Sequence, residues 1–295
     1  MSQPKEPMFF SRSESKSGLK RYVECFASGP ECEDVRVIGE ASTTYLSFPH
    51  VPSRIAGLLG TDLKFIFVLR NPAERAVSAY WHTAKRFHEF RSLDEVFMIE
   101  MISPGATFAA EDQGIRLAEE AGQIVTTGYD TKLGDRHWQF RYLRNSFYID
   151  DLKRYEGTFG RDQLLVLLTD DLSTRPVETF RRIASFLGID GDSIPLSVGT
   201  RHNVTKVPSR NTAARLLLQM TERSPPFLAR LLRRVHSAFR SSAPAAPAVV
   251  SESLGRLFRE HNEQLSEYLN RDLLSWATPL SLTPRLSQHG ISDAQ

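Results

Sequence analysis

Short apolar runs predict three strands. They cover residues 35–39, 64–69 and 163–168, and a polar turn follows each run. The runs are nearly continuous rather than alternating, which is typical of strands buried on both faces in a parallel sheet. The pattern therefore predicts an α/β fold with an open parallel sheet flanked by helices.

Helical spacing appears between and after these runs. A helix is expected over residues 72–87, because Asn71 is a good N-cap and Pro72 suits the first helical position. Apolar residues over 176–187 recur at helical spacing, and Gly188 supplies a stop. Strands thus alternate with helices, as in layered α/β proteins.

The last third of the chain has a different pattern. Residues 211–239 are expected to be helical and basic, with a break at Pro225-Pro226, and residues 241–247 are interpreted as a linker. Apolar positions over 254–269 predict a further amphipathic helix. One domain over residues 1–280 is expected, followed by a polar tail over 281–295.

Composition narrows the class of protein. The chain has 295 residues, of which 41% are hydrophobic and 24% are charged, as in ordinary globular proteins. Lys and Arg number 37 against 35 Asp and Glu, so the net charge of +2 gives no support for nucleic-acid binding. Any anion site must therefore be local.

Targeting and metal signals are weak. The sequence shows no apolar run of signal-peptide or membrane-span type, so a cytoplasmic location is expected. Cys25 and Cys32 are expected to be reduced, with a local disulfide as the alternative. No Cys/His spacing resembles a zinc site.

The most informative segment spans residues 64–80. A buried strand ends at Leu69, Arg70 follows at once, and a helix begins with Asn71-Pro72. A helix N-terminus attracts anions, and a guanidinium adds a bidentate contact to phosphate. Ser78 lies seven residues beyond Asn71, about two helical turns, so it returns to the same side. The alternative is that Arg70 pairs with a nearby carboxylate and Ser78 fills a surface position.

The string LRNPAERAVSAY, residues 69–80, resembles the 3′-phosphate-binding segment of sulfotransferases that use 3′-phosphoadenosine 5′-phosphosulfate (PAPS). The resemblance implies that Arg70 and Ser78 hold the 3′-phosphate of that donor. Residues 39–46, GEASTTYL, are similar to a further block of the bacterial and heparan-sulfate-type members. The family resemblance implies a P-loop-NTPase-like open parallel sheet, PAPS as donor and no metal.

A general base is implied by the same resemblance. KEPMFF at residues 5–10 is similar to the (K/N)ExxFF element of heparan-sulfate-type sulfotransferases, in which the glutamate takes the acceptor proton. Glu6 inherits that role by position. The alternative is a solvated residue on a frayed terminus.

One family element is not found in the sequence. Family members carry a (K/R)xGTT phosphate loop some twenty-odd residues before that glutamate, whereas only five residues precede Glu6 and no such loop occurs elsewhere. The chain is therefore interpreted as N-terminally truncated, with the first strand and the phosphate loop missing. Weak nucleotide binding and little turnover are expected of such a chain.

Further candidates are less specific. By resemblance, the basic loop over residues 201–210 closes over the nucleotide, which makes Arg201, Lys206 and Arg210 candidate phosphate contacts; a solvated surface loop is the alternative. Glu40 is expected either near the acceptor or in a structural role. Tyr148 is expected to pack.

The predicted function is transfer of a sulfuryl group from PAPS to a hydroxyl or amine of a carbohydrate or other small acceptor in a bacterial cytoplasm. A P-loop kinase is one rival, but the sequence lacks a Walker B metal site and an adenylate lid. An inactive sulfotransferase or a peripheral membrane-binding protein is another, because residues 225–239 are amphipathic and basic.

Overall fold

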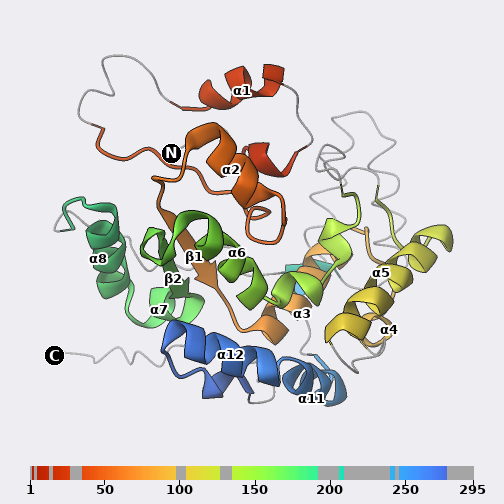
Figure 1. The fold of residues 1–295 in the computed structure, drawn as a ribbon. Helices are drawn as coiled ribbons and strands as arrows, with labels where there is room; N and C mark the ends of the chain where they lie inside the picture. Colours follow the sequence, from red (N-terminus) through yellow and green to blue (C-terminus); the bar gives the residue numbers. More distant parts are fainter. Residues whose placement is uncertain are drawn as a thin grey trace, which may run out of the picture.

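A computed structural model shows helices packed around a small parallel sheet (Figure 1). Its two central strands lie in the middle of the molecule, and helices from every part of the described chain surround them. The structure describes residues 2, 5–12, 16–26, 35–97, 104–126, 135–191, 206–208, 240–242 and 246–277.

Two of the three predicted strands form this sheet. Strand β1 (Phe65–Leu69) pairs in parallel with β2 (Leu164–Leu168), in a register that runs from Phe65↔Leu164 to Leu69↔Leu168. The two carboxyl ends therefore lie at the same edge, where Arg70 follows Leu69. The predicted α/β class with a parallel sheet is confirmed.

The third predicted strand, over residues 35–39, is wrong. The segment is not a strand and pairs with neither β1 nor β2. Val35, Val37 and Ile38 are 48%, 40% and 61% exposed, so the run is not buried either. An apolar run becomes a buried parallel strand only where a neighbouring strand completes its ladder and helices cover its faces. Within the described residues, the run 35–39 has neither a neighbouring strand nor helices that cover its two faces.

Strand β1 is also less buried than its sequence suggests. Phe65 and Phe67 pack into an apolar cluster with the N-terminal region, and Leu69 is 2% exposed. Ile66 and Val68 on the alternate face are 36% and 49% exposed. The strand is thus covered mainly on one side.

The predicted helices are largely confirmed. The helix expected at 72–87 ends three residues earlier, the one at 176–187 has the predicted bounds, and the one at 254–269 is part of two helices separated at Phe258. Helices α7 and α8 pack on β2, and α12 packs on α6. The described α-helices are α1 (Lys16–Val23), α2 (Val51–Leu59), α3 (Pro72–Ala84), α4 (Leu93–Phe97), α5 (Pro104–Glu120), α6 (Ile149–Phe159), α7 (Thr169–Thr174), α8 (Pro176–Leu187), α11 (Ala248–Leu257) and α12 (Arg259–Leu269).

A second, short sheet lies in the last third of the chain. Strand β3 (Lys206–Pro208) pairs antiparallel with β4 (Arg240–Ser242). The linker predicted over 241–247 is therefore wrong at its start, where Ser241 and Ser242 belong to β4 and pair with β3.

Several predictions fall outside the described residues. They concern most of the basic segment 211–239, including the amphipathic stretch 225–239, and the polar tail 281–295. Cys25 has a free thiol, but Cys32 is not among the described residues, so its state stays a prediction. None of the helices in the described part of the chain has the length and apolar character needed to span a bilayer.

Candidate active site

The turn between β1 and α3 is built by an asparagine cap. The side-chain Oδ1 of Asn71 accepts from the backbone N–H of Ala73 at 3.0 Å and of Glu74 at 3.4 Å. The backbone N–H of Arg75 donates to the Asn71 carbonyl at 2.9 Å, and Pro72 has no N–H. The predicted N-cap is confirmed. Because Asn71 engages these donors, an anion here meets the helix dipole and side chains rather than free first-turn N–H groups.

Arg70 forms the ion pair that was the alternative to a phosphate contact. Its Nε donates to Oε2 of Glu74 at 2.9 Å, and the two side chains are 35% and 37% exposed. A pair so accessible to water is weak and exchangeable. Ser78 lies one helical turn beyond Glu74 and is partly buried, and no described residue bonds its hydroxyl. Arg70 thus lies just before α3 and bonds Glu74, while Glu74 and Ser78 are four residues apart and share one side of the helix.

The backbone of this turn is fixed from outside. The hydroxyl of Tyr148 donates to the Arg70 carbonyl at 3.0 Å, and Nδ2 of Asn71 donates to the Trp276 carbonyl at 3.4 Å. The Arg75 guanidinium donates to the Tyr142 carbonyl at 3.1 Å, so it supports the fold rather than facing the edge. Tyr148 is buried, as predicted, and burial raises its pKa to about 12.

A charged clamp at the carboxyl end of β2 was missed from the sequence. The Asp171 carboxylate accepts hydrogen bonds from both terminal nitrogens of Arg271 at 2.5 Å and from the backbone N–H of Leu168 at 3.1 Å. Burial alone would raise the pKa of Asp171, but the Arg271 and Leu168 donors hold it below its usual value. The pair joins the end of β2 to the end of α12, so it stiffens the edge that carries Arg70. The only signal for this pair in the sequence is the Asp170-Asp171 turn that follows the strand.

The N-terminal segment that carries Glu6 is packed rather than frayed. Phe9 and Phe10 are 6% and 1% exposed, and they contact Tyr22 and Tyr45. The hydroxyl of Thr43 donates to Oε2 of Glu6 at 3.3 Å. The Glu6 side chain itself is partly exposed, so a proton acceptor sits on a supported segment within reach of solvent.

The structure brings only part of the predicted site together. Arg70 and Ser78 share the β1–α3 turn, whereas within the described residues no hydrogen bond or ion pair joins Glu6 to either of them. The two regions are joined by apolar packing. Leu46 packs against the apolar cluster that contains Phe9 and Phe10, and also against the cluster that contains Leu69.

The remaining candidates are described only in part. Lys206 begins strand β3, but its side chain is not described. Arg201 and Arg210 lie outside the described residues, so their contacts to phosphate stay predictions.

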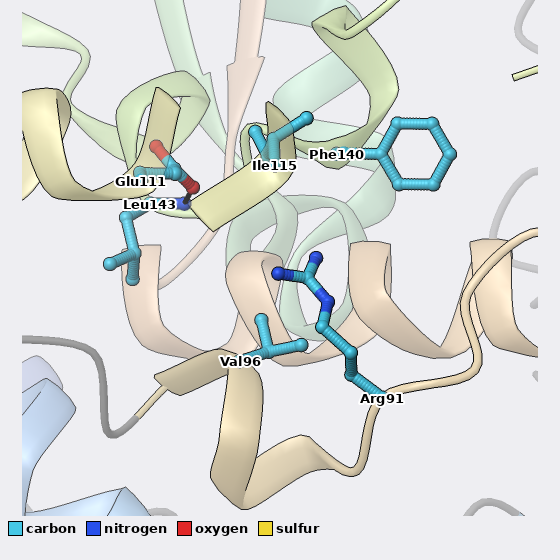
Figure 2. Close-up of a pocket in the computed structure, with 6 residues that line it drawn as sticks. All are labelled: Arg91, Val96, Glu111, Ile115, Phe140 and Leu143. Atoms are coloured by element: carbon cyan, nitrogen blue, oxygen red, sulfur yellow. Dashed lines mark hydrogen bonds between the residues drawn. The ribbon is translucent and has the colours of Figure 1, made fainter. Parts of the chain in front are cut away.

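A small cavity lies between α4, α5 and residues 140–143 (Figure 2). Its volume is about 10 Å³, enough for roughly one water molecule. The Glu111 carboxylate accepts from the backbone N–H of Leu143 at 2.7 Å and of Arg144 at 3.0 Å, and burial raises its pKa to about 7. Its lining residues are Arg91, Val96, Glu111, Ile115, Phe140 and Leu143. The cavity is too small for a substrate. The hydrogen bonds of Glu111 on α5 tie that helix to residues 143–144.

Across the described ranges, no group of three or more His, Cys, Asp or Glu side chains could hold a metal ion. Among the polar groups at the carboxyl edge, Arg70 and Ser78 are of the types that suit a phosphate.

The described fold is thus that of an α/β protein with a parallel sheet, in which an arginine, an asparagine cap and a helical serine follow the carboxyl end of β1. The family model for the sulfotransferase domain matches residues 5–224. The chain therefore belongs to the sulfotransferase domain family, whose chemistry is the transfer of a sulfuryl group.

Known proteins agree with this family. The chain is 29% identical over 184 residues to human bifunctional heparan sulfate N-deacetylase/N-sulfotransferase 2, an alignment covering 62% of this chain and 18% of that protein. It is 24% identical over 277 residues to the mouse N-deacetylase/N-sulfotransferase 4, covering 92% of this chain and 27% of the relative. The matched region is thus about a fifth to a quarter of these relatives.

A solved structure shows the same fold. The crystal structure of a sulfotransferase from Alicyclobacillus acidocaldarius matches with a TM-score of 0.59 at 21% sequence identity. The match covers 94% of this chain and 87% of that one. The fold is therefore that of a P-loop-like sulfotransferase.

Proposed function

We propose that this protein transfers a sulfuryl group from PAPS to a hydroxyl or amine of a carbohydrate or other small acceptor. The observation that carries the proposal is the β1–α3 turn: Arg70 follows the carboxyl end of β1 and bonds Glu74, and Ser78 lies one turn beyond Glu74 on the same side of the capped helix. Phosphate groups bind at such edges.

The residues present fit the 3′-phosphate of PAPS. Arg70 would contribute a charged donor and Ser78 a hydroxyl that no described residue engages. Glu74 would have to release Arg70, at small cost because both side chains are about one-third exposed. Lys206, with Arg201 and Arg210, is proposed to add positive charge around the same nucleotide.

PAPS supplies an activated sulfuryl group when it is bound. In the proposed step the acceptor oxygen or nitrogen attacks sulfur, a new S–O or S–N bond forms, and the bond from sulfur to the 5′-phosphate oxygen breaks. Glu6 takes the proton from the attacking group, and 3′-phosphoadenosine 5′-phosphate leaves with the electron pair. Positioning and charge stabilisation dominate such group transfers, and a well-placed base contributes roughly 10²–10⁴-fold.

The acceptor class is taken from the relatives. Two matched proteins are heparan sulfate N-deacetylase/N-sulfotransferases by name. A carbohydrate amine is therefore the first acceptor to try, and a carbohydrate hydroxyl the second. Glu6 could serve either, because both must lose a proton as the new bond forms.

Calorimetric titration with 3′-phosphoadenosine 5′-phosphate tests the nucleotide site. Arg70→Ala should weaken binding by about 1.5–3 kcal/mol, roughly 10- to 150-fold, because one charge-assisted contact is lost. Arg116→Ala is the matched control, since it removes an exposed arginine on α5 away from the turn. Equal affinity of the two variants for the nucleotide would show that Arg70 does not contact it. Absence of binding by a folded wild-type chain would favour the inactive form.

A further inference from the structure

The carboxylate of Glu40 is the centre of a hydroxyl network (Glu40, Ser42 and Tyr45) that the proposed chemistry does not use. Its Oε1 accepts from the hydroxyls of Tyr45 at 2.8 Å and Tyr22 at 3.1 Å. Its Oε2 accepts from the Ser42 hydroxyl at 3.0 Å. A carboxylate that accepts from three hydroxyls fixes the direction in which each of them donates its proton.

Two of these hydroxyls also hold the segment that carries Glu6. The backbone N–H of Met8 donates to Oγ of Ser42 at 3.0 Å, and that of Phe10 donates to the Tyr45 hydroxyl at 3.3 Å. Each hydroxyl has one proton, and Glu40 accepts it, so a lone pair is left facing the backbone N–H. Hydrogen bonds in such a chain polarise one another. Glu40 thus sets the direction of both links.

The segment needs this support because its backbone is strained. Glu6 has φ 59° and Met8 has φ 52°, in the left-handed region that residues with a Cβ seldom adopt. Such conformations persist only where the surroundings enforce them, and they concentrate at functional sites. The link to Ser42 falls on Met8 itself, one of the two strained positions.

The same loop also contacts the proposed base directly. Thr43, next to Ser42, donates its hydroxyl to Oε2 of Glu6 at 3.3 Å. Fixing Ser42 and Tyr45 on either side of Thr43 therefore fixes the donor that meets the Glu6 carboxylate. The partners of this loop lie 34–37 residues away along the chain, so the contact is tertiary rather than local.

We infer that Glu40 is a positioning residue, which orients Ser42 and Tyr45 so that residues 6–10 keep the conformation presenting the Glu6 carboxylate. This inference rests on the proposed function, in which Glu6 is the base. Burial and the nearby Glu40 raise the pKa of Tyr45, so its hydroxyl keeps the proton that it donates. Burial raises the pKa of Glu40 although its three hydroxyl donors lower it.

Amide hydrogen exchange measures the network directly. In Glu40→Gln one carboxylate oxygen becomes an NH2 group, which presents donors to a hydroxyl that is already a donor, so the link from that hydroxyl to Met8 or Phe10 should loosen. We expect exchange of at least one of these two amides to rise tenfold or more, while nucleotide affinity at the Arg70 turn stays at the wild-type value. Unchanged exchange at both amides would overturn the inference.

Single-hydroxyl variants keep the test decisive if Glu40→Gln does not fold. Ser42→Ala should speed exchange of Met8 alone, and Tyr45→Phe that of Phe10 alone, because each removes one link. Tyr22→Phe is the matched control, since its hydroxyl bonds Glu40 but no backbone N–H of the segment in the described contacts. Equal effects of all three variants would contradict a directed network.

Turnover then separates this inference from the proposed function. If Glu6 is the base, Glu40→Gln should lower kcat tenfold or more without raising the KM for the nucleotide, in parallel with Glu6→Gln. Faster exchange in Glu40→Gln, with transfer unaffected by Glu6→Gln, would remove Glu6 as the base while the network still holds the segment. Normal turnover in Glu40→Gln alongside a damaged Glu6→Gln would show that the network does not position the base.

Discussion

The β1–α3 turn and the N-terminal segment are both candidate site regions, but they are held in different ways. The side-chain bonds within the turn are local, because Asn71 caps the helix that follows it and Arg70 pairs with Glu74 four residues away. Tyr148 and Trp276 add support from outside. The segment over residues 5–12 is held by loop 40–45, whose bonds to it cross 33–37 residues. The turn can be predicted largely from neighbouring residues, whereas the N-terminal segment depends on contacts that only the complete fold supplies.

The difference also concerns how each region would respond to damage. A capped helix beginning in the core transmits a defect to the whole domain, because Ala76 and Tyr80 of α3 are almost fully buried. A segment fixed by hydroxyl links at its edge can loosen locally while the rest of the domain stays folded. Mutations at the two regions should therefore separate global stability from local order.

The largest expected effect is at the charged clamp beside the turn. Asp171→Asn should lower the free energy of unfolding by about 2–3 kcal/mol, because it leaves Arg271 without its ion partner, and the partial exposure of Arg271 limits the loss. Urea unfolding measures the change. The control Glu178→Gln breaks only an exposed pair with Arg175, so it should change stability by less than about 0.5 kcal/mol. Similar losses in both would show that the clamp contributes no more than a surface pair.

The clamp also gives a direction with pH. The folded-state pKa of Asp171 lies below its ordinary value, so the stabilisation is present above about pH 4. It should disappear as pH falls through the folded-state pKa. The difference in unfolding free energy between wild type and Asp171→Asn should therefore shrink on acidification, and a constant difference down to low pH would contradict the ion pair as its source.

An intermediate effect is expected at the helix cap. Asn71→Ala should cost about 1 kcal/mol of global stability, because the N–H groups of Ala73 and Glu74 lose their acceptor. Asn71→Asp keeps the acceptor for these N–H groups but loses the donor to the Trp276 carbonyl, so comparing the two variants separates the cap from that bond. Ser42→Ala in the N-terminal region should instead show most of its effect in local exchange. If Asn71→Ala left the free energy of unfolding in urea unchanged, the cap at this turn would not contribute to the stability of the whole domain.

The sequence predicted what is local and failed where distant partners decide. The strand before Arg70, the asparagine cap and helix α8 follow from neighbouring residues, and all three are confirmed. Residues 35–39 have the same apolar character as β1 but lack a strand neighbour in the described fold, so propensity alone misplaced them. The Asp171–Arg271 clamp spans 100 positions, and nothing in either residue's surroundings specifies the other.

The smallest expected effect tests whether the local turn is set for a ligand or only for itself. Glu74 pairs with the guanidinium of Arg70 and lies one turn before Ser78 on α3, so its carboxylate would compete with and repel a phosphate bound there. Glu74→Gln should therefore tighten binding of 3′-phosphoadenosine 5′-phosphate by about threefold, or roughly 0.6 kcal/mol, in keeping with an exposed pair. Global stability should change by less than about 0.5 kcal/mol.

The sign of that change decides the meaning of the pair. Tighter binding in Glu74→Gln that disappears when Arg70→Ala is added would show that Glu74 and the phosphate share one partner. Weaker binding in Glu74→Gln would show instead that Glu74 holds Arg70 in the orientation the nucleotide needs, and the turn would then resemble the N-terminal segment in depending on a carboxylate for its geometry. Calorimetric titrations of the two single variants and the double variant, at one salt concentration, distinguish these outcomes because salt screens exposed charges.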